Sequence, residues 1–461
     1  MATNFYTTSQ GGAYNQTTVP PVNISLDNLR RTFDLSGEIA ELRPQESPFF
    51  SYLTRLRKIA TPDPVFKMME QRHQWQRRNF YVSTGATKAY NNITDLQVSC
   101  KYDSRGKTTT AAQAPIFFVP GQIVAIENVT NGSNTGTFYG RVTSATTDSG
   151  FTKVTMTPLF ILTATSKAAI NSGNVVFPVN ARGQIVGTAY PEGSGAPDSW
   201  YDFLSQTEGY AQIFKTACPM MSGSAMATEY RGRKNEFMRI WDEKLREHKM
   251  DMEHAFLFGV GNISTANSGS LLPESSDTVA VKRYTWGILP FVSLYGNVAT
   301  FSYSNSGYNN FVDWSRDMFA PENGNSGSKL VLASRKLISW FNKLGNGTFL
   351  GNTLAGGSAQ LDIQNVKSQF GFNLTRVSCV FGDFNFVAHP LLREQWEDYC
   401  LVIDLGQVAY RPLVGNGISR DTFYQTNVQA PDIDGRIDQI ITEAGMQITL
   451  PETHAVLKWN A

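Results

Sequence analysis

The sequence predicts an α+β protein that carries a small all-β domain in its first half. A length of 461 residues suggests about three domains. The stretch 224–258 has the apolar spacing of an amphipathic helix, and the stretch 115–180 contains short β-branched runs between turn signals. From residue 284 onward helical and extended patterns are mixed, which is typical of an α+β domain.

The N-terminal part is expected to be largely extended. Residues 1–29 are polar and rich in Gly, Asn and Thr, so we expect a tail that a neighbouring subunit holds in place. Ser47 followed by Pro48 predicts the start of a short helix that ends at Leu56. Residues 64–82 are basic and aromatic and favour a strand.

Residues 115–180 are expected to form a small barrel or sandwich that is inserted into the rest of the chain. Turn signals occur at Pro120-Gly121, at Asn131-Gly132 and at residues 148–150. They separate strands predicted at 116–119, 123–127, 138–142, 154–157 and 175–179.

A linker rich in Gly, Ser and Pro is predicted at 188–202, and a strand at 211–217. The helix over 224–258 would span about 50 Å at about 1.5 Å per residue, and Gly259 is placed to end it. Its apolar face consists of Phe237, Trp241, Leu245, Met252 and Phe256. Further helices are predicted at 284–295, 309–319 and 334–344. Further strands are predicted at 329–333, 372–380, 384–388, 400–411 and 437–459.

The composition favours a protein that packs against copies of itself. Charged residues make up 17% of the chain, against roughly 25% in an average soluble protein, and aromatic residues make up 12%. Interface cores are depleted in charge and enriched in aromatic side chains. The 40 basic and 39 acidic residues give a net charge of +1, which argues against a nucleic-acid binder but not against a container for nucleic acid.

The chain has the features of a protein folded in a cytosol. Its cysteines are scattered and lack a C-x-x-C pair, which predicts reduced thiols: Cys100, Cys218, Cys379 and Cys400. The N-terminus has no signal-peptide pattern, and no run of about 18 apolar residues predicts a membrane span.

Candidate catalytic motifs are incomplete. Residues 106–108 imitate the end of a phosphate-binding loop, but Lys101 stands where the leading glycine belongs. Residues 259–264 resemble half of a dinucleotide fingerprint but follow a helix, so a helix end is favoured. Residues 432–435 resemble a calcium loop without its later ligands, and a turn between strands is favoured. We therefore expect no catalytic residues, no cofactor and no bound metal, and a protein that is not an enzyme.

Two groups of polar residues keep alternative interpretations. His248, Asp251 and His254 could share a face of the long helix, where a solvated or interface-facing polar stripe is favoured over a metal site. Basic clusters form either a solvated face or ion pairs between subunits, where an arginine engages carboxylates in a bidentate manner. The clusters are Arg72, Arg77 and Arg78 in one strand, and Arg231, Arg233 and Lys234 at the start of the helix.

The order of these elements resembles the major capsid proteins of tailed bacteriophages with the Hong-Kong-97 fold. Residues 209–259 are similar to the family's returning E-loop strand and spine helix, and PVFKMMEQR at 64–72 resembles the outgoing E-loop strand. The positions that fill the family pattern are Ile213, Phe214, Gly223, Ala225, Gly232, Glu236, Asp251, Glu253, Ala255, Leu257 and Gly259.

The resemblance implies a division of the chain into the family's parts. Residues 1–60 would be the N-arm with a short helix, 61–114 and 181–222 the E-loop strands and linkers, and 115–180 an inserted β domain. Residues 223–280 and 405–461 would form the P-domain with the spine helix, and 281–404 the A-domain.

The implied function is self-assembly, as hexamers and pentamers, into an icosahedral head shell that encloses double-stranded DNA without sequence-specific binding. The implied partners are portal and scaffolding proteins and a decoration or cement protein, with assembly in the host bacterial cytoplasm. We expect scaffolding to come from a separate protein. The alternative is another virion component, of the tail or the decoration, and a hydrolase is disfavoured because no nucleophile motif exists.

Overall fold

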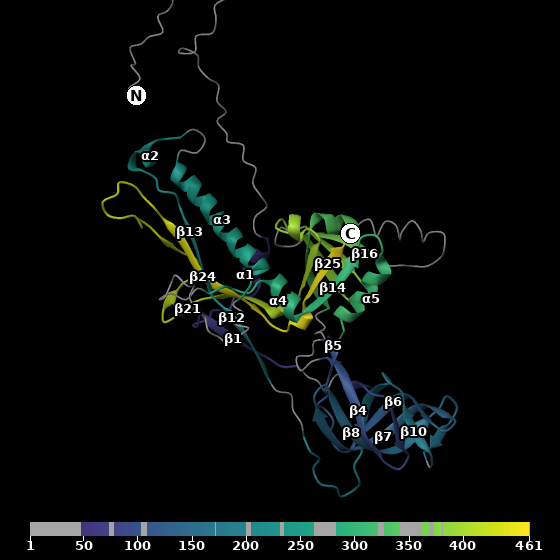
Figure 1. The fold of residues 1–461 in the computed structure, drawn as a ribbon. Helices are drawn as coiled ribbons and strands as arrows, with labels where there is room; N and C mark the ends of the chain where they lie inside the picture. The colour runs from purple at the N-terminus through teal and green to yellow at the C-terminus, as the bar shows by residue number, and fades with distance from the viewer. Residues whose placement is uncertain are drawn as a thin grey trace, which may run out of the picture.

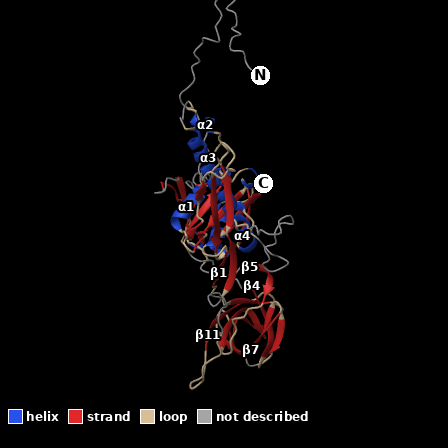
Figure 2. Ribbon diagram, turned by 90° about the vertical axis from the view of Figure 1, so that its left-hand side faces the viewer, coloured by secondary structure: helices blue, strands red, loops and turns tan. Residues whose placement is uncertain are grey.

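The structure is a computed structural model in which helices and strands are mixed along the chain. It describes residues 48–72, 78–102, 108–170, 172–199, 204–230, 235–261, 283–320, 327–341, 362–367, 373–379 and 381–460. Figure 1 shows a mixed α/β body, with helix α3 along one side and a separate β unit below it. Figure 2 shows the same separation from the side, with strand β1 between the two parts.

The β unit is built around a closed ring of strands. Its ten-stranded sheet has the order β11-β2-β4-β8-β7-β6-β10-β3, with β5 also paired to β4 and β9 to β8. An additional pairing of β11 with β6 closes a ring through β2, β4, β8 and β7. The strands are β2 (Asn79–Val82), β3 (Ala86–Ala89), β4 (Ile93–Tyr102), β5 (Thr108–Gln113), β6 (Gln122–Asn131), β7 (Asn134–Asp148), β8 (Phe151–Leu162), β9 (Lys167–Ala169), β10 (Asn174–Phe177) and β11 (Arg182–Thr188).

The predicted bounds of this β unit, 115–180, are too narrow. Strands β2 to β5 and β11 belong to the same sheet, and apolar side chains of β2, β3, β4 and β11 join the same core. In that core Phe80 from β2 and Ile185 from β11 pack with Val124 from β6. Strands β2 and β3 have four residues each and β11 has seven. Runs this short show too little alternation of apolar and polar residues to be assigned to this sheet from sequence.

The strand predicted at 116–119 is wrong, although Phe117 and Phe118 are buried. Phe117 and Phe118 join the core of the β unit, but the segment has no strand partner. The side chain of Gln122 supplies the missing hydrogen bonds instead. Its Oε1 accepts from the amide of Val119 at 3.0 Å, and its Nε2 donates to the carbonyl of Phe117 at 3.0 Å. A buried backbone satisfied by a side chain needs no ladder.

The body contains a seven-stranded sheet that is covered on both faces. Its order is β14 (Asn297–Ser302), β25 (Ala455–Asn460), β19 (Tyr399–Ile403), β15 (Ser328–Ala333), β18 (Asp383–Ala388), β17 (Asn373–Ser378) and β16 (Asp362–Lys367). Along β15, Leu330 and Leu332 face one hydrophobic core, whereas Val331 and Ala333 face another. Continuous burial of this kind is expected where layers cover both sides of a sheet.

Helices contribute to both of these cores. Helix α5 (Tyr308–Met318) and the helical residues 335–341 supply one core, through Phe311 and Phe341. Helices α1 (Pro48–Leu56), α3 (Glu236–Phe258) and α4 (Ile288–Tyr295) supply the other, through Phe49, Phe256 and Phe291.

A second sheet of the body lies against α3. It has the order β13 (Gln212–Ala217), β24 (Gln439–Ile448) and β20 (Val408–Pro412), with β23 (Phe423–Gln425) also paired to β24. Two short strands, β21 (Val414–Gly415) and β22 (Ile418–Ser419), form a hairpin nearby.

The long helix is shorter than predicted and is buried along a different part of its length. A five-residue helix, α2 (Gly223–Ala227), ends at Thr228 in extended backbone, and α3 begins only at Glu236. Its N-cap Asn235 accepts from the amide of Met238 at 3.1 Å, and Gly259 is its C-cap, as predicted. The buried side chains of α3 all lie in its second half: His248, Met252, Glu253, Phe256 and Leu257. Of the predicted apolar face, Met252 and Phe256 are buried, whereas Phe237, Trp241 and Leu245 are half-buried.

Two predicted strands are each divided between the two sheets. The prediction at 400–411 corresponds to β19 and β20, separated by the 3₁₀ turn η4 (Leu405–Gln407), where Asp404 Oδ1 accepts from the amide of Gly406 at 3.0 Å. The prediction at 437–459 corresponds to β24 and β25, separated by η5 (Pro451–Thr453). Leu450, with φ of 47°, and Pro451 interrupt the second strand, because neither can continue a ladder.

The other predicted elements lie close to their expected positions. The helices predicted at 284–295 and 309–319 are α4 and α5, and the described part of the one predicted at 334–344 is helical. The predicted strand at 64–82 corresponds to two strands, β1 (Val65–Glu70) and β2. Strand β1 pairs antiparallel with β12 (Ser205–Tyr210) in a two-stranded sheet, here called the arm, which brackets the β unit in sequence. No described helix is long and apolar enough to cross a membrane.

The imidazole of His454 is fully buried beside the start of β25. Its Nδ1 accepts from the amide of Asp404 at 3.0 Å, so the neutral ring is the form that fits. Burial lowers the pKa of His454 to about 4, the ammonium of Lys329 lowers it further, and Asp404 opposes both. Because this folded-state pKa lies below the ordinary value, the resulting stabilisation is full above about pH 6.5 and is lost as the pH falls through about 4.

We predict that His454 makes the fold acid-sensitive. The depressed pKa corresponds to about 3 kcal/mol of unfolding free energy lost between neutral pH and about pH 4, at about 1.36 kcal/mol per pKa unit. Urea unfolding of the unassembled subunit at several pH values should show a shallower pH slope for His454→Gln than for the wild type. The exposed His254 provides the matched control, His254→Gln. An unchanged slope in His454→Gln would contradict the assignment.

Candidate functional site at the base of the arm

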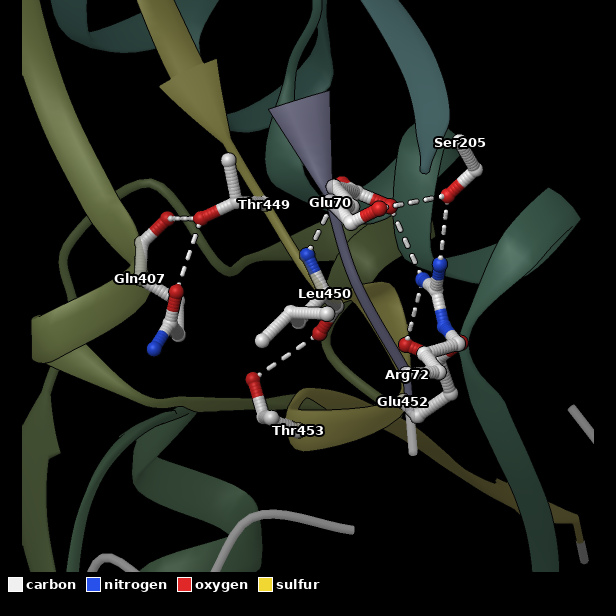
Figure 3. Close-up of polar contacts among 8 residues, drawn as sticks. All are labelled: Glu70, Arg72, Ser205, Gln407, Thr449, Leu450, Glu452 and Thr453. Carbon is white, nitrogen blue, oxygen red and sulfur yellow. Dashed lines mark hydrogen bonds and ion pairs between the residues drawn. The ribbon is translucent and has the colours of Figure 1, made fainter. Parts of the chain in front are cut away.

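Residues 449–454 connect the two sheets of the body and also hold the arm. They join β24, in the middle of the smaller sheet, to β25 in the seven-stranded sheet. Figure 3 shows that side chains from β1, from the residue that begins β12 and from η4 all converge on this connector. The connector is therefore the place where the arm and both sheets meet.

Arg72 is the centre of the arm's attachment. It follows β1, and its Nη2 lies 2.9 Å from Glu70 Oε2 and 2.9 Å from Glu452 Oε2. Its Nε donates to the other oxygen of Glu452, so the guanidinium binds that carboxylate with two hydrogen bonds. Nη1 donates to Ser205 Oγ at 3.0 Å, which ties both strands of the arm to η5. All of these contacts are drawn in Figure 3.

Glu70 reaches the connector by a second route. Its Oε1 accepts from the amide of Leu450 at 3.0 Å. Leu450 has a left-handed backbone, which is uncommon for a residue with a branched side chain and is kept only where the surroundings impose it. The turn at Leu450 therefore both ends β24 and directs an N–H group at the arm.

Further hydrogen bonds fix the rest of the connector to both sheets. Thr449 Oγ1 donates to the Gln407 carbonyl at 3.0 Å, and Thr453 Oγ1 donates to the Leu450 carbonyl at 2.9 Å. Lys329 on β15 is buried, and its Nζ donates to the Thr453 carbonyl at 2.8 Å. Burial lowers the pKa of Lys329 to about 8, although Asp404 opposes the shift.

In this cluster the attraction between Arg72 and the two carboxylates opposes the effect of burial on the pKa values of Arg72 and Glu452. Burial alone would lower the pKa of Arg72, but the hydrogen bonds and charges of Glu452 and Glu70 more than offset it and raise the pKa, so the guanidinium stays charged. Burial raises the pKa of Glu452, and Arg72 partly opposes the shift. Arg72 therefore counteracts the effect of burial on Glu452, and the cluster joins the arm to η5 through charge-assisted hydrogen bonds.

A second buried carboxylate links α1 to α3. Glu253, in the second half of α3, is fully buried. Its Oε1 accepts from the amide of Phe49, in the first turn of α1, at 3.2 Å and also from Nε2 of His389. His389 Nδ1 accepts from the amide of Leu391 at 3.2 Å, which identifies the tautomer whose proton is on Nε2. A carboxylate at a helix N-terminus also interacts favourably with the helix dipole.

The predicted polar stripe on the long helix is not one surface. His248 is fully buried between the sheet strands, with Nδ1 2.9 Å from Thr216 Oγ1 and Nε2 2.8 Å from Thr442 Oγ1. Burial lowers its pKa. Asp251 and His254 are exposed on the other side of α3. The prediction that His248 is solvated is wrong because a ring with both nitrogens hydrogen-bonded can replace an apolar side chain in the core.

The predicted basic clusters have different outcomes. Arg72 lies in the buried cluster, which contradicts a fully solvated face. Arg77 and the cluster Arg231, Arg233 and Lys234 lie outside the described residues. Residues 432–435, which resemble a calcium loop in sequence, form an exposed turn. Gly259, the first residue of the partial dinucleotide fingerprint, ends α3. Among the residues that the structure describes, no three His, Cys, Asp or Glu side chains are grouped to hold a metal ion.

Glu70, Glu452 and His389 were not singled out from the sequence, and Glu253 was named only as a position that fills the family pattern. Glu70 did leave a signal, because it occupies the same alternating face of β1 as the buried Phe66 and Met68. An acidic side chain in the buried phase of a strand indicates a buried cationic partner. The partner Glu452 is distant in sequence and carries no comparable local signal.

Comparisons with known proteins show which proteins the chain is similar to. A family model described as "SU10 major capsid protein" matches residues 3–460. No curated protein matches the sequence. Solved structures similar to the chain include the capsid of a native GTA particle, with 8% identity, a TM-score of 0.41 and coverage of 94% of this chain and 97% of the other. Another is from Microbacterium phage Oxtober96, with 10% identity, a TM-score of 0.39 and coverage of 94% and 97%.

We predict that removal of the Arg72 guanidinium destabilises the fold strongly. Arg72→Met would leave Glu70 and Glu452 buried without their cation, which costs about 3 to 5 kcal/mol in comparable buried pairs. The matched control is Arg316→Met on α5, whose ion pair with Asp317 is exposed to solvent, so its loss should leave the unfolding free energy nearly unchanged. Urea unfolding of the unassembled subunit measures both. Equal unfolding free energies for the two variants would contradict the central role of Arg72.

Proposed function

This chain belongs to the SU10 major capsid protein family, and from that premise we propose how it builds a bacteriophage head shell. As a major capsid protein it is a virion component that self-assembles into the oligomers of the shell. The observation that carries this function is the family match over residues 3–460. A role in the tail or the decoration, the earlier alternative, is disfavoured by the same match.

The subunit would have the Hong-Kong-97 fold, with the family's parts at adjusted bounds. The antiparallel pair β1 and β12 supports an E-loop, and the closed ring of strands between them supports an inserted β domain over 79–188 rather than 115–180. Helix α3 with the sheet of β13, β24 and β20 would be the P-domain with its spine helix. The seven-stranded sheet supports the A-domain, though β25, which lies between β14 and β19, comes from the segment assigned to the P-domain.

The connector at 449–454 would set the direction of the arm in the shell. An arm of two strands has little core of its own, so its orientation depends on attachment at its base. Arg72 supplies that attachment through carboxylates on the arm and on η5. In a ring of subunits each arm must meet its neighbour at the same angle. Heterologous contacts close into a ring only if that angle between neighbouring subunits is kept.

The partners beyond the chain itself would be those of a head shell. Portal and scaffolding proteins, and a decoration or cement protein, would contact it during assembly in the host bacterial cytoplasm. Double-stranded DNA would be enclosed without sequence-specific contacts, consistent with a net charge of +1. The family role is structural, so catalysis, cofactors and resident metal ions are not part of the proposal.

We predict that the full chain, expressed with its scaffolding protein, forms closed shells. Negative-stain electron microscopy should show shells, or rings of five and six subunits. Arg72→Met should reduce the yield of closed shells and increase open or irregular assemblies, whereas Arg316→Met should assemble as the wild type does. Persistent monomers, or tubes from the wild-type chain, would contradict a shell-forming role.

A further inference from the structure

We propose that the outer face of the β unit binds an oligosaccharide in a groove that crosses β4, β2, β11, β6 and β7. An open hollow of about 730 Å³ lies on these strands. Its size is within the roughly 300–1,000 Å³ of small-ligand sites. The proposal does not depend on the shell-forming function, because the β unit has a hydrophobic core of its own.

Strand register places a continuous row of side chains along and beyond this groove. Asn79 is paired with Gln184, Gln184 with Ala125, Ala125 with Tyr139, and Tyr139 with Phe160. Residues directly opposite each other on paired strands share one face of a sheet. The row therefore runs across β2, β11, β6, β7 and β8 on a single face.

That face is the outer one. Along β11 the exposed Gln184 alternates with the buried Gly183, and along β2 the half-buried Tyr81 follows the buried Phe80. Phe80 belongs to the core of the β unit. Glycine at 183 is needed because a Cβ there would lie 2.4 Å from the Phe80 ring, so the strand pair is held close over the core. The side chains of the row consequently face away from the core.

Aromatic rings stand at one end of the row and beside its other end. Tyr139 and Phe160 stack with ring centroids 4.7 Å apart at an interplanar angle of 22°. At the other end Tyr81 is paired with Arg182 in the neighbouring row, and Lys101 Nζ lies 5.4 Å from the Tyr81 ring centre. Tyr81 lines the hollow, whereas Tyr139 and Phe160 lie beyond it, and Lys167 Nζ lies 4.2 Å from the Phe160 ring centre.

The side chains between these aromatic rings match the chemistry of a sugar. The amides of Asn79 and Gln184 each carry both donors and an acceptor, as neighbouring hydroxyl groups on a pyranose ring require. Ala125 keeps the floor of the groove low between them. The apolar C–H face of a sugar ring packs on an aromatic ring, whose negative face attracts polarised hydrogen atoms.

A single strand of nucleic acid fits this groove less well. Such a ligand needs a continuous basic track along its phosphates as well as stacking rings. Here Glu127 lines the groove, and its Oε1 lies 3.7 Å from Arg182 Nε, so this arginine is already neutralised in part. A carboxylate in the middle of the track would repel a phosphate chain.

The test uses assembled particles of the full chain and a glycan array printed with neutral and acidic bacterial oligosaccharides. We expect wild-type particles to bind at least one printed oligosaccharide. Tyr81→Ala, Tyr139→Ala and Gln184→Ala should each weaken that binding about tenfold in a titration. Tyr90→Ala removes an exposed tyrosine from the same unit outside the groove and should bind as the wild type does.

Three results would overturn the proposal: no printed oligosaccharide bound, groove variants that bind as well as Tyr90→Ala, or stronger binding of a single-stranded DNA 20-mer. Gln184 is exposed, so Gln184→Ala keeps the test valid if a tyrosine variant misfolds. Electron micrographs of the same samples report shell formation separately. Absence of shells would count against the proposed function, and glycan binding would then be measured on the unassembled subunit.

Discussion

The architecture depends on one partly buried arginine, Arg72, that attaches an arm with little core of its own to a body with a large core. Removing a guanidinium from water costs free energy, which the two carboxylates that face Arg72 offset. Glu452 binds the guanidinium with two hydrogen bonds. Glu70 binds it with one and is itself held by the amide of Leu450. These hydrogen bonds are directional, so they fix the position of the arm relative to the body. An apolar contact of equal area has no preferred direction and would allow the arm to shift along the body.

The same constraint explains why residues 449–454 tolerate an unfavourable backbone. The left-handed conformation of Leu450 is compensated because it directs an N–H group at Glu70, ends β24 and starts the turn that carries Glu452. Buried polar groups on either side, Lys329 and His454, are satisfied by backbone atoms of the same region. The connector thus couples both sheets and the arm in one rigid unit.

Local patterns predicted the elements better than their partners. The glycines of the turns at 121, 132 and 150 all have positive φ, and α4, α5, β13 and β18 lie close to their predicted bounds because each is encoded by its own sequence. The closure of the β unit requires β6 to pair with β11, and the arm requires Arg72 to meet Glu452, which is 380 residues away. Contacts at that separation leave no periodicity, and only Glu70, acidic in a buried phase, indicated that a partner existed.

The separation of cores has a consequence for how this subunit can vary. The apolar side chains of the β unit form one cluster and those of the body form two others, so a substitution in one part leaves the packing of the other unchanged. The arm fixes only the direction in which the β unit extends from the body, and Arg72 sets that direction at the base of the arm. A surface on the β unit can therefore acquire a binding role while the shell-forming body stays the same, because the two are joined by geometry and not by a shared core.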